Sequence, residues 1–295
     1  MQDCFQGKII KGIAGFYYIH SNGIVYECKA KGAFRNRKIK PLVGDDVELT
    51  VLDDEKHLGN IEKILPRHSK LIRPAVANVD QAVVVFAAMA PAPNFNLLDR
   101  FLLMMEKQEI PVIICINKTD LVSDTQLEEY RFIYEKSGYE MVMISTYEEE
   151  GISLLKEMLK GKTTALAGPS GVGKSSIMNL LNPNASMETG EISQKIQRGK
   201  HTTRHSEILP IGKDTYLVDT PGFSSIYFFD MEEEELKTYY HEFEPYEPYC
   251  RFRGCNHIGE TECGVKQAVE KKELPESRYE NYKLFFEEIK SQKKY

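Results

Sequence analysis

The sequence predicts a multidomain protein in which an N-terminal β-barrel precedes a central α/β domain and a small, mainly α-helical C-terminal domain. Three observations predict it. The first part of the chain contains short strand-like segments separated by glycines, and the middle part alternates nearly continuous hydrophobic runs with helix-like stretches. Near the end, three cysteines and one histidine lie within fourteen residues. A chain of 295 residues has room for this arrangement, since domains usually span about 100 to 200 residues.

The composition limits where the protein can work. The chain has 38 Lys and Arg against 44 Asp and Glu, which gives a formal net charge of −6. No segment approaches the roughly 18 apolar residues of a membrane span, and the start of the chain has no basic segment leading into an apolar run. We therefore expect a cytoplasmic protein that does not associate with a membrane.

Residues 1–68 form the first expected domain. Its strand candidates begin at Gly7, Gly15, Gly23, Asp46 and Gly59. Five strands in this length fit a small barrel of the oligonucleotide-binding (OB) fold. Aromatic residues in it could stack on nucleic-acid bases or simply belong to the core: Phe16, Tyr17, Tyr18 and Phe34.

A basic segment lies within this acidic chain. Between Lys29 and Lys40 the basic residues are Lys29, Lys31, Arg35, Arg37, Lys38 and Lys40, with no acidic residue among them. Such a segment is either a contact for nucleic-acid phosphates or a solvated loop, and charge alone does not decide between them.

Residues 69–228 form the second expected domain. Hydrophobic runs typical of parallel strands covered on both faces begin at Val83, Val112, Met141, Thr164 and Tyr216. Helix candidates lie between them at residues 97–108, 127–137, 152–159 and 175–181. This alternation predicts a doubly wound α/β domain.

A phosphate-binding motif follows one of these strands. Residues 168–175 match G-x-x-x-x-G-K-[ST], placed after a strand and before a helix as its chemistry requires. The glycines let backbone N–H groups point at phosphates, Lys174 reaches the β and γ phosphates, and Ser175 ligates Mg²⁺. The residues expected to line the nucleotide phosphates are Gly168, Pro169, Ser170, Gly171, Val172, Gly173, Lys174, Ser175 and Ser176.

The segment from Asp219 to Gly222 ends another hydrophobic strand with the sequence Asp-Thr-Pro-Gly. This position puts Asp219 near the metal ion and Gly222 where a backbone amide can sense the γ phosphate. Together with the phosphate-binding loop, the segment indicates a nucleoside triphosphatase with a switch.

A third motif selects the base. Asn117, Lys118, Thr119 and Asp120 form an N-K-x-D sequence at the end of the second hydrophobic strand. The carboxylate of Asp120 can accept from both guanine N1–H and the 2-amino group, whereas adenine offers no donor there. Such a site rejects ATP because its buried acceptor would stay unpaired, so the sequence predicts a GTPase. Ser145, after the third strand, lies where a GTPase S-A motif contacts the base.

The polar segment between Gly199 and His205 suits a mobile switch. Thr202 or Thr203 is expected to complete the Mg²⁺ shell, and we favour Thr203 because an arginine follows it, as in similar GTPases. The residue after Gly222 is Phe223, which cannot orient water. His201 is the nearest titratable alternative, and it either positions the attacking water, contacts RNA or only solvates the loop.

Residues 229–295 form the third expected domain, and residues 270–294 look helical apart from Pro275. Its Cys250, Cys255, His257 and Cys263 can supply three thiolates and one imidazole to one tetrahedral ion. Four protein ligands make a closed, structural zinc site. The scattered Cys4, Cys28 and Cys115 are expected to be ordinary thiols.

The order of the motifs is unusual, because the base-selecting motif precedes the phosphate-binding loop. The motifs are therefore circularly permuted, which leaves a compact site unchanged when the original termini are close. With this order, the N-terminal barrel and the Cys-x4-Cys-x-His-x5-Cys cluster, the chain closely resembles the ribosome small-subunit-dependent GTPase A family. Arg73-Pro74, residues 77–80 and the Gly-Lys-His-Thr-Thr segment at residue 199 are also similar to that family.

The resemblance implies a cytoplasmic GTPase that acts in late maturation of the 30S subunit, binds 16S rRNA near the decoding region and hydrolyses GTP faster on the subunit. The implied cofactors are GTP or GDP, Mg²⁺ and one structural Zn²⁺, and we expect a monomer. The alternative is a binding module in which GTP turnover times release from a non-ribosomal protein partner.

Overall fold

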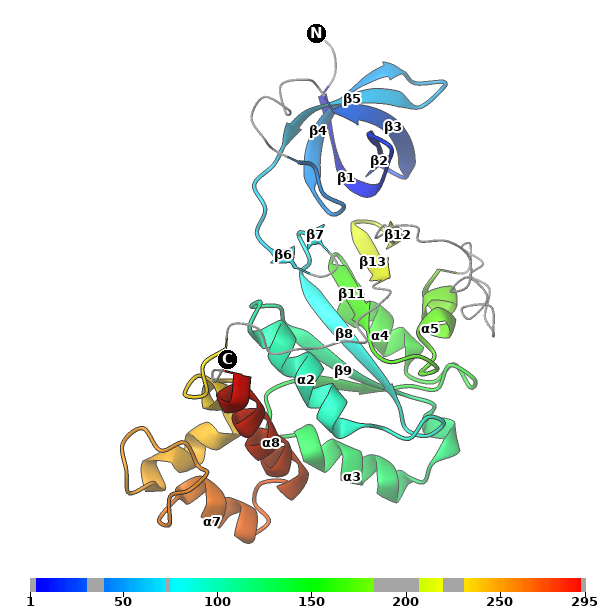
Figure 1. Ribbon diagram of the computed structural model, residues 1–295. Coiled ribbons are helices and arrows are strands. Elements are labelled where there is room, and N and C mark those ends of the chain that lie inside the picture. The colour runs from blue at the N-terminus through cyan, green and yellow to red at the C-terminus, as the bar shows by residue number, and fades with distance from the viewer. Residues whose placement is uncertain (1–3, 31–39, 73–74, 183–206, 220–230, 293–295) are drawn as a thin grey trace.

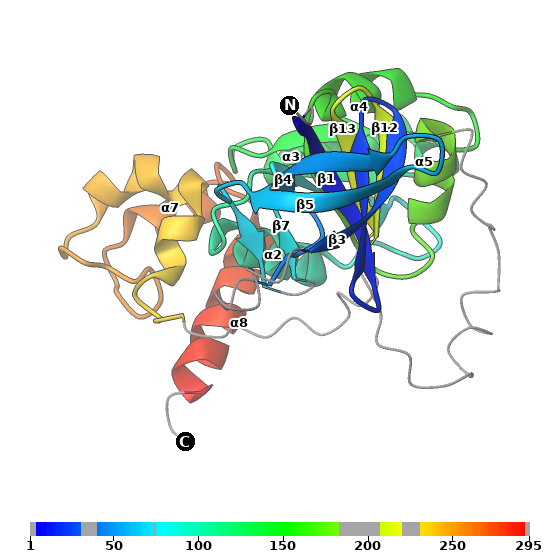
Figure 2. The same ribbon diagram turned by 90° about the horizontal axis from the view of Figure 1, so that it is seen from above.

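The computed structural model describes residues 4–30, 40–72, 75–182, 207–219 and 231–292. A β-barrel lies at one end, next to a central sheet with helices on both faces, and a small helical unit lies beside helix α2 at the other end (Figure 1). Viewed from the barrel side, the barrel covers the end of the sheet that carries β12 and β13 (Figure 2).

The barrel consists of β1 (Cys4–Ile13), β2 (Phe16–Ser21), β3 (Ile24–Ala30), β4 (Asp46–Asp53) and β5 (Leu58–Ile64). It closes in the order β1-β2-β3-β5-β4, with β3 and β5 parallel and the other strand pairs antiparallel. Alternate residues fill its interior, among them Ile9, Ile19, Val47, Leu49 and Ile61. Five strands in this order confirm the expected OB-type barrel.

A short connection ties the barrel to the sheet. Its two-stranded sheet pairs β6 (Lys70–Leu71) with β7 (Val76–Ala77). The next residue, Asn78, is fully buried, and its Nδ2 donates to Gly44 O at 3.1 Å and Asp46 Oδ2 at 3.0 Å. A Cβ on Gly44 would lie 2.0 Å from Ala77 O, so only glycine permits this close approach of the backbones.

The central sheet has six strands: β8 (Gln81–Ala87), β9 (Val112–Asn117), β10 (Glu140–Met143), β11 (Thr163–Ala167), β12 (Glu207–Gly212) and β13 (Thr215–Asp219). Their spatial order is β10-β9-β8-β11-β13-β12, and only β12 runs antiparallel to its neighbour. All five expected strands are confirmed. The edge strand β12 was not predicted, because Pro210 and half-buried residues give it no clear hydrophobic pattern.

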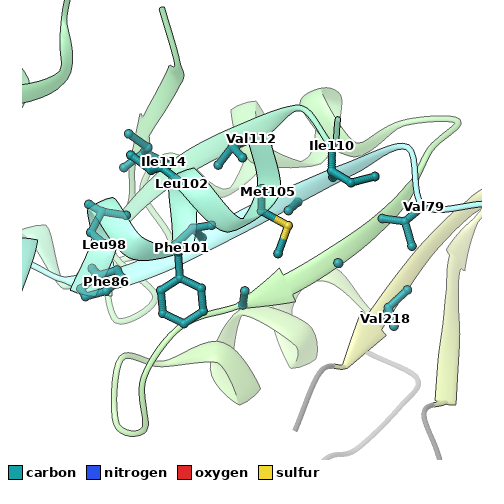
Figure 3. Packing of buried hydrophobic residues seen from close by; sticks show 14 of the residues in the cluster. Val79, Phe86, Leu98, Phe101, Leu102, Met105, Ile110, Val112, Ile114 and Val218 are labelled. Atoms are coloured by element: carbon teal, nitrogen blue, oxygen red, sulfur yellow. The ribbon is translucent and has the colours of Figure 1, made fainter. Parts of the chain in front are cut away.

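Helices cover both faces of the sheet, as expected. Helices α2 (Phe95–Glu106) and α3 (Asp124–Tyr134) lie on one face, and α4 (Ile152–Leu159) and α5 (Lys174–Leu181) pack on the other. Figure 3 shows Leu98, Phe101, Leu102 and Met105 of α2 directed at the strands. The asparagine before α2, Asn94, caps it by accepting from Leu97 N at 3.0 Å.

The C-terminal unit contains the 3₁₀ segments η2 (Leu236–Tyr239) and η3 (His241–Tyr249) and helices α7 (Gly264–Glu270) and α8 (Glu276–Gln292). Helix α8 begins directly after Pro275, which fits a proline that cannot continue a helix but can precede one. Aromatic side chains dominate the core of this unit. Among the described helices, none has the length and apolar character needed to cross a bilayer.

Helix α8 is fastened to α2 by a buried ion-pair network that the sequence did not reveal. Arg278 donates to Asp99 Oδ1 and to Glu242 Oε1, each at 2.7 Å, and all three side chains are almost fully buried. Tyr134 and Asn281 also donate to Asp99. Burial raises the pKa of Asp99, and these donors oppose that rise. The network joins the helical unit to the central domain.

The expected domain limits stay predictions. The last barrel strand ends at Ile64, and the two-stranded connection extends to Ala77, on both sides of the expected limit between residues 68 and 69. The other expected limit, between residues 228 and 229, lies outside the described residues. Packing also crosses the first limit, because Ile10 of the barrel belongs to the same buried cluster as Val218 of the central sheet.

Candidate nucleotide site and metal cluster

The nucleotide motifs meet at one edge of the central sheet. Asn117 is the last residue of β9, Gly168 directly follows β11, and Ser145 lies just beyond β10. These strands are parallel, so their carboxyl ends share an edge. The chain proceeds from β8 to one side and from β11 to the other, and ligands of open α/β sheets bind in the crevice at such a reversal.

Glycines shape the phosphate-binding loop. Gly168 has φ +140°, and a Cβ there would lie 2.2 Å from Val85 O. Gly173 has φ +98°, and its Cβ would lie 2.2 Å from Nδ2 of Asn117. Larger residues would therefore push the loop away from the strand and from the base-selecting motif.

Helix α5 starts at this loop. Gly173 precedes it and offers no capping side chain, so the first N–H groups of the helix can serve an anion. Lys174 Nζ donates to the carbonyls of Gly168 at 2.8 Å and Pro169 at 2.6 Å, which holds the ammonium over the loop. Ser175 is exposed in the first turn, and Ser176 is half-buried beside it.

Asn117 connects the three segments of the site. Its side chain is fully buried, its Nδ2 donates to Val172 O at 2.8 Å, and its Oδ1 accepts from Thr146 N at 3.2 Å. One amide therefore fixes the base-selecting motif against the phosphate loop and against the segment after β10. The N-K-x-D motif predicts that Asn117 binds the nucleotide, but it does not predict this connecting role.

Lys118 lies across the phosphate loop. It adopts the left-handed conformation at φ +64°, and its Nζ donates to Gly171 O at 2.9 Å and to Ala90 O. These two carbonyls fix the ammonium in place, so the Lys118 side chain bridges the base-selecting motif and the phosphate loop. Beside it, Thr119 N donates to Ile144 O at 3.2 Å.

Asp120 is exposed at the rim and is oriented by a buried neighbour. Ser145 Oγ donates to Asp120 Oδ1 at 2.6 Å and accepts from Glu148 N at 3.0 Å. Ser145 itself is fully buried. The sequence suggested that Ser145 touches the base, whereas the structure places its hydroxyl on the carboxylate that would do so. An ionised carboxylate held in this way offers only acceptors, which is the arrangement guanine requires.

Several expected site residues lie outside the described part of the chain. They are His201, Thr202, Thr203 and Gly222, and the basic residues Lys31, Arg35, Arg37 and Lys38 do so as well. The backbone of Asp219 is described at the end of β13, in register with Leu166 of β11. Asp219 therefore leaves the sheet at the edge where the phosphate loop begins.

The four expected metal ligands come together in the C-terminal unit. Ligand atoms of Cys250, Cys255, His257 and Cys263 all lie within 4.8 Å of one another. Cys250 Sγ is 3.9 Å from Cys263 Sγ and 3.6 Å from His257 Nδ1. Tetrahedral zinc with Zn–S of about 2.3 Å sets its sulfurs about 3.8 Å apart, so this donor set fits zinc in size and chemistry.

The surroundings of the cluster also suit a structural ion. His257 Nε2 lies 3.4 Å from Glu247 Oε1, which leaves Nδ1 facing the thiols. Burial raises the pKa of Cys255 to about 12, so without a cation its thiol would be neutral. Two tyrosines of α8 anchor the loop, with Tyr279 donating to His257 O and Tyr282 to Asn256 O. Their i, i+3 spacing was the only sequence signal for them.

Comparison with known proteins gives one consistent family. The family model described as RsgA GTPase matches residues 64–229, and the RsgA N-terminal domain model matches residues 6–60. The Small ribosomal subunit biogenesis GTPase RsgA of Agathobacter rectalis is 58% identical, over 98% of this chain and 99% of the relative. The protein of the same name from Alkaliphilus metalliredigens is 49% identical, over 98% and 99%.

Solved structures agree with this result. YjeQ from Thermotoga maritima superposes with a TM-score of 0.79 at 38% identity, covering 97% of this chain and 99% of that one. A structure described as YloQ, a circularly permuted GTPase, gives a TM-score of 0.79 at 38% identity, covering 98% and 96%. The permuted order of the motifs is thus found in a relative of known structure.

Proposed function

Since the chain belongs to the RsgA family of GTPases, we propose that it binds the 30S ribosomal subunit and its 16S rRNA late in subunit maturation and hydrolyses GTP in response. Its activity is that of a ribosome-biogenesis GTPase, which converts GTP and water to GDP and phosphate. The names of the relatives disfavour the alternative in which a non-ribosomal protein is the partner. The protein acts as a monomer in the cytoplasm.

The observation that carries the GTPase assignment is the pair of hydrogen bonds in which Asn117 donates to Val172 O and accepts from Thr146 N, because they unite base and phosphate recognition. A GTPase uses GTP, GDP and Mg²⁺. Lys174 and the N–H groups around Gly171 and Gly173 bind the phosphates, and Asp120 selects guanine. These residues position the nucleotide and neutralise its charge, which is the main protein contribution to phosphoryl transfer.

The remaining roles follow from the motif positions. Ser175, Thr203 and Asp219 hold Mg²⁺, Thr202 lies beside them, and Gly222 senses the γ phosphate. His201 orients the attacking water, because Phe223 stands where a polar residue would do so. In the C-terminal unit one Zn²⁺, bound by the Cys250 cluster, is structural, since all four positions are taken by protein ligands.

The partners are recognised by the flanking domains, residues 1–68 and 229–295. The barrel carries Lys29 and Lys40 at the ends of its basic segment, and cationic residues of this kind bind RNA phosphates with strong salt dependence. Among the aromatics suggested for stacking, Phe16, Tyr17 and Tyr18 are half-buried, and Lys29 Nζ lies 5.1 Å from the Phe16 ring centre. Phe16 and Lys29 therefore form a cationic, aromatic site on the barrel.

Turnover measured with and without purified 30S subunits tests the proposal. We expect slow GTP hydrolysis alone and faster hydrolysis with 30S, and no effect of 50S subunits. A chain that binds GTP yet shows neither stimulation by 30S subunits nor affinity for them would overturn the ribosomal role. Equal binding of ATP and GTP would overturn the assignment of the base site.

A further inference from the structure

The barrel contacts the central sheet at two places of very different character. The first is the connection around Asn78 and Gly44, which is fully buried and closely packed. A neighbouring ion pair supports it, because Arg67, whose side chain is 27% exposed, donates from Nε at 2.6 Å to Oδ1 of the fully buried Asp45. Buried backbones in such close contact have little freedom to slide, so this first contact is the firm attachment.

The second contact joins the barrel to the β12–β13 hairpin and combines buried with more exposed groups, since Lys8 and Tyr216 are buried whereas Lys11 is half-exposed. Lys11 Nζ of β1 lies 3.0 Å from Glu207 Oε1 at the start of β12. His20 Nδ1 of β2 lies 3.0 Å from the Tyr216 hydroxyl of β13, with the two rings edge to face. Lys8 Nζ is 5.6 Å from the centre of the same Tyr216 ring. We call this set of contacts the barrel joint.

The hairpin under the barrel joint has its two ends at functional positions. Glu207 and Asp219 are directly opposite each other in the antiparallel register of β12 and β13. The chain enters β12 shortly after Thr203 and leaves β13 at the Asp-Thr-Pro-Gly motif, so the expected Mg²⁺ ligand Thr203 and the expected γ-phosphate sensor Gly222 are both connected to this one end. Lys11 holds the same end from the barrel side.

The side chains of the barrel joint allow its strength to vary. Lys11 and Glu207 are 35% and 48% exposed, and an ion pair of this kind is weak and easily rearranged. Burial, with Asp214 and Asp46, raises the pKa of Tyr216 to about 12, so its hydroxyl stays protonated and hydrogen-bonded. A displacement of Glu207 therefore alters the Lys11–Glu207 pair first. Lys8 is held more firmly, because its Nζ also lies 3.3 Å from Gly44 O and 2.8 Å from Asp46 Oδ1.

We propose that the barrel joint couples the nucleotide to RNA binding: the nucleotide state changes the Lys11–Glu207 and His20–Tyr216 contacts, and RNA on the barrel biases the switches in return. Such reciprocity is required of any coupling between two binding equilibria. The link to RNA rests on the proposed function. The link between barrel and nucleotide does not, and it is tested by itself.

The first test is a double-mutant cycle in the full chain with Lys11→Gln, Glu207→Gln and both, followed by thermal unfolding with GDP and with a non-hydrolysable GTP analogue. We expect the coupling between Lys11 and Glu207, expressed as a factor in the unfolding equilibrium constant, to differ by up to about fivefold between the two nucleotides. This is the range found for exposed ion pairs. Equal coupling with GDP and with the GTP analogue would overturn the proposal, whether or not the protein acts on the ribosome.

The second test measures turnover of Tyr216→Phe and Glu207→Gln alone and with 30S subunits. Tyr216→Phe keeps the ring and removes only the hydroxyl that reaches His20. We expect basal turnover and 30S affinity within about twofold of the original chain, and stimulation reduced about threefold or more. The control Lys63→Gln removes a barrel charge paired with Glu48, away from the hairpin, and should leave stimulation unchanged.

The outcomes separate the two proposals. Full stimulation of both variants overturns the role of the barrel joint in RNA coupling and leaves the ribosomal function intact. Absence of stimulation in the original chain overturns the ribosomal function. The double-mutant cycle then decides by itself whether the nucleotide state alters the barrel joint. Loss of 30S affinity in the two variants equal to their loss of stimulation would show an RNA contact instead of a coupling element, and would also overturn the proposal.

Discussion

Arg278 of α8 and Asp99 of α2 form an ion pair of 2.7 Å that is buried on both sides, at a distance of 179 residues along the chain. Glu242 shares the same guanidinium. Although burial alone would lower it, the two carboxylates raise the pKa of Arg278 well above its ordinary value. The helical unit therefore rests on the central domain through one cation and two anions.

Removing that cation should be severely destabilising. Arg278→Met leaves Asp99 and Glu242 buried without their partner, and breaking a buried pair costs about 3–5 kcal/mol. We expect a markedly lower unfolding temperature and easier proteolytic release of the C-terminal unit. The control is Glu262→Gln, which breaks the exposed pair with Arg251 and should cost less than about 1 kcal/mol. Equal stabilities of the two variants would contradict this interpretation.

The contact of Gly173 with Asn117 predicts a specific loss of nucleotide binding. Gly173→Ala places a methyl group 2.2 Å from Asn117 Nδ2, so it displaces the amide that joins base and phosphate recognition. Gly138→Ala is the matched control, because Gly138 has a similar φ of +81° but open space around it. Both should lose about 1 kcal/mol of stability from backbone strain. Only Gly173→Ala should weaken GDP binding, by about tenfold or more in calorimetry.

The cysteine cluster predicts one zinc ion per chain. Cys255→Ser removes one of four ligands and should abolish stoichiometric zinc and loosen the C-terminal unit, because Cys255 and Cys263 belong to its core. Cys4→Ser changes an exposed thiol and should retain the metal. Elemental analysis gives the stoichiometry, and GDP titration checks that the distant nucleotide site is intact. Full zinc in Cys255→Ser would refute the assigned ligand set.

The environment of His20 predicts a dependence of stability on pH. Burial lowers the pKa of His20, and Asp214 opposes the shift. Because the unfolded chain binds the proton more readily, the contribution of neutral His20 is complete above about pH 6.5 and is lost as the pH falls below it. His20→Gln should therefore have a flatter stability curve between about pH 7 and 5. Lys8, Asp46 and Tyr216 also face this position, so the test is the change in slope.

Features that depend on neighbouring residues in the chain could be predicted from the sequence, whereas contacts between distant segments could not. The strands and helices of the central domain follow from local hydrophobic patterns, and helix α4 has the predicted bounds of residues 152–159. The motif at residues 168–175 and the cluster of three cysteines and one histidine could be recognised because each lies within a short segment. Edge strand β12 was missed because Pro210 interrupts it and its short sequence has no clear hydrophobic pattern.

Side-chain partnerships between distant segments could not be predicted. Arg278 lies in a charged helix, where an arginine is normally exposed, and Asp99 lies among the apolar residues of helix α2. An acid in the apolar face of a helix was the one available signal that a cation would meet it. The hydroxyl of Ser145 on Asp120 likewise depends on how two strand ends are juxtaposed, which one sequence does not reveal.

The strand order has a consequence for synthesis of the chain. Strands β10, β9 and β8 form one half of the sheet and leave the ribosome before β11, so β8 has an unpaired edge until β11 arrives. Unpaired edges of this kind invite pairing with other chains during folding. The N-K-x-D motif is also made before the phosphate loop, because Asn117 precedes its partner Val172 by 55 residues. A nucleotide can therefore assist folding only late, after most of the domain has emerged.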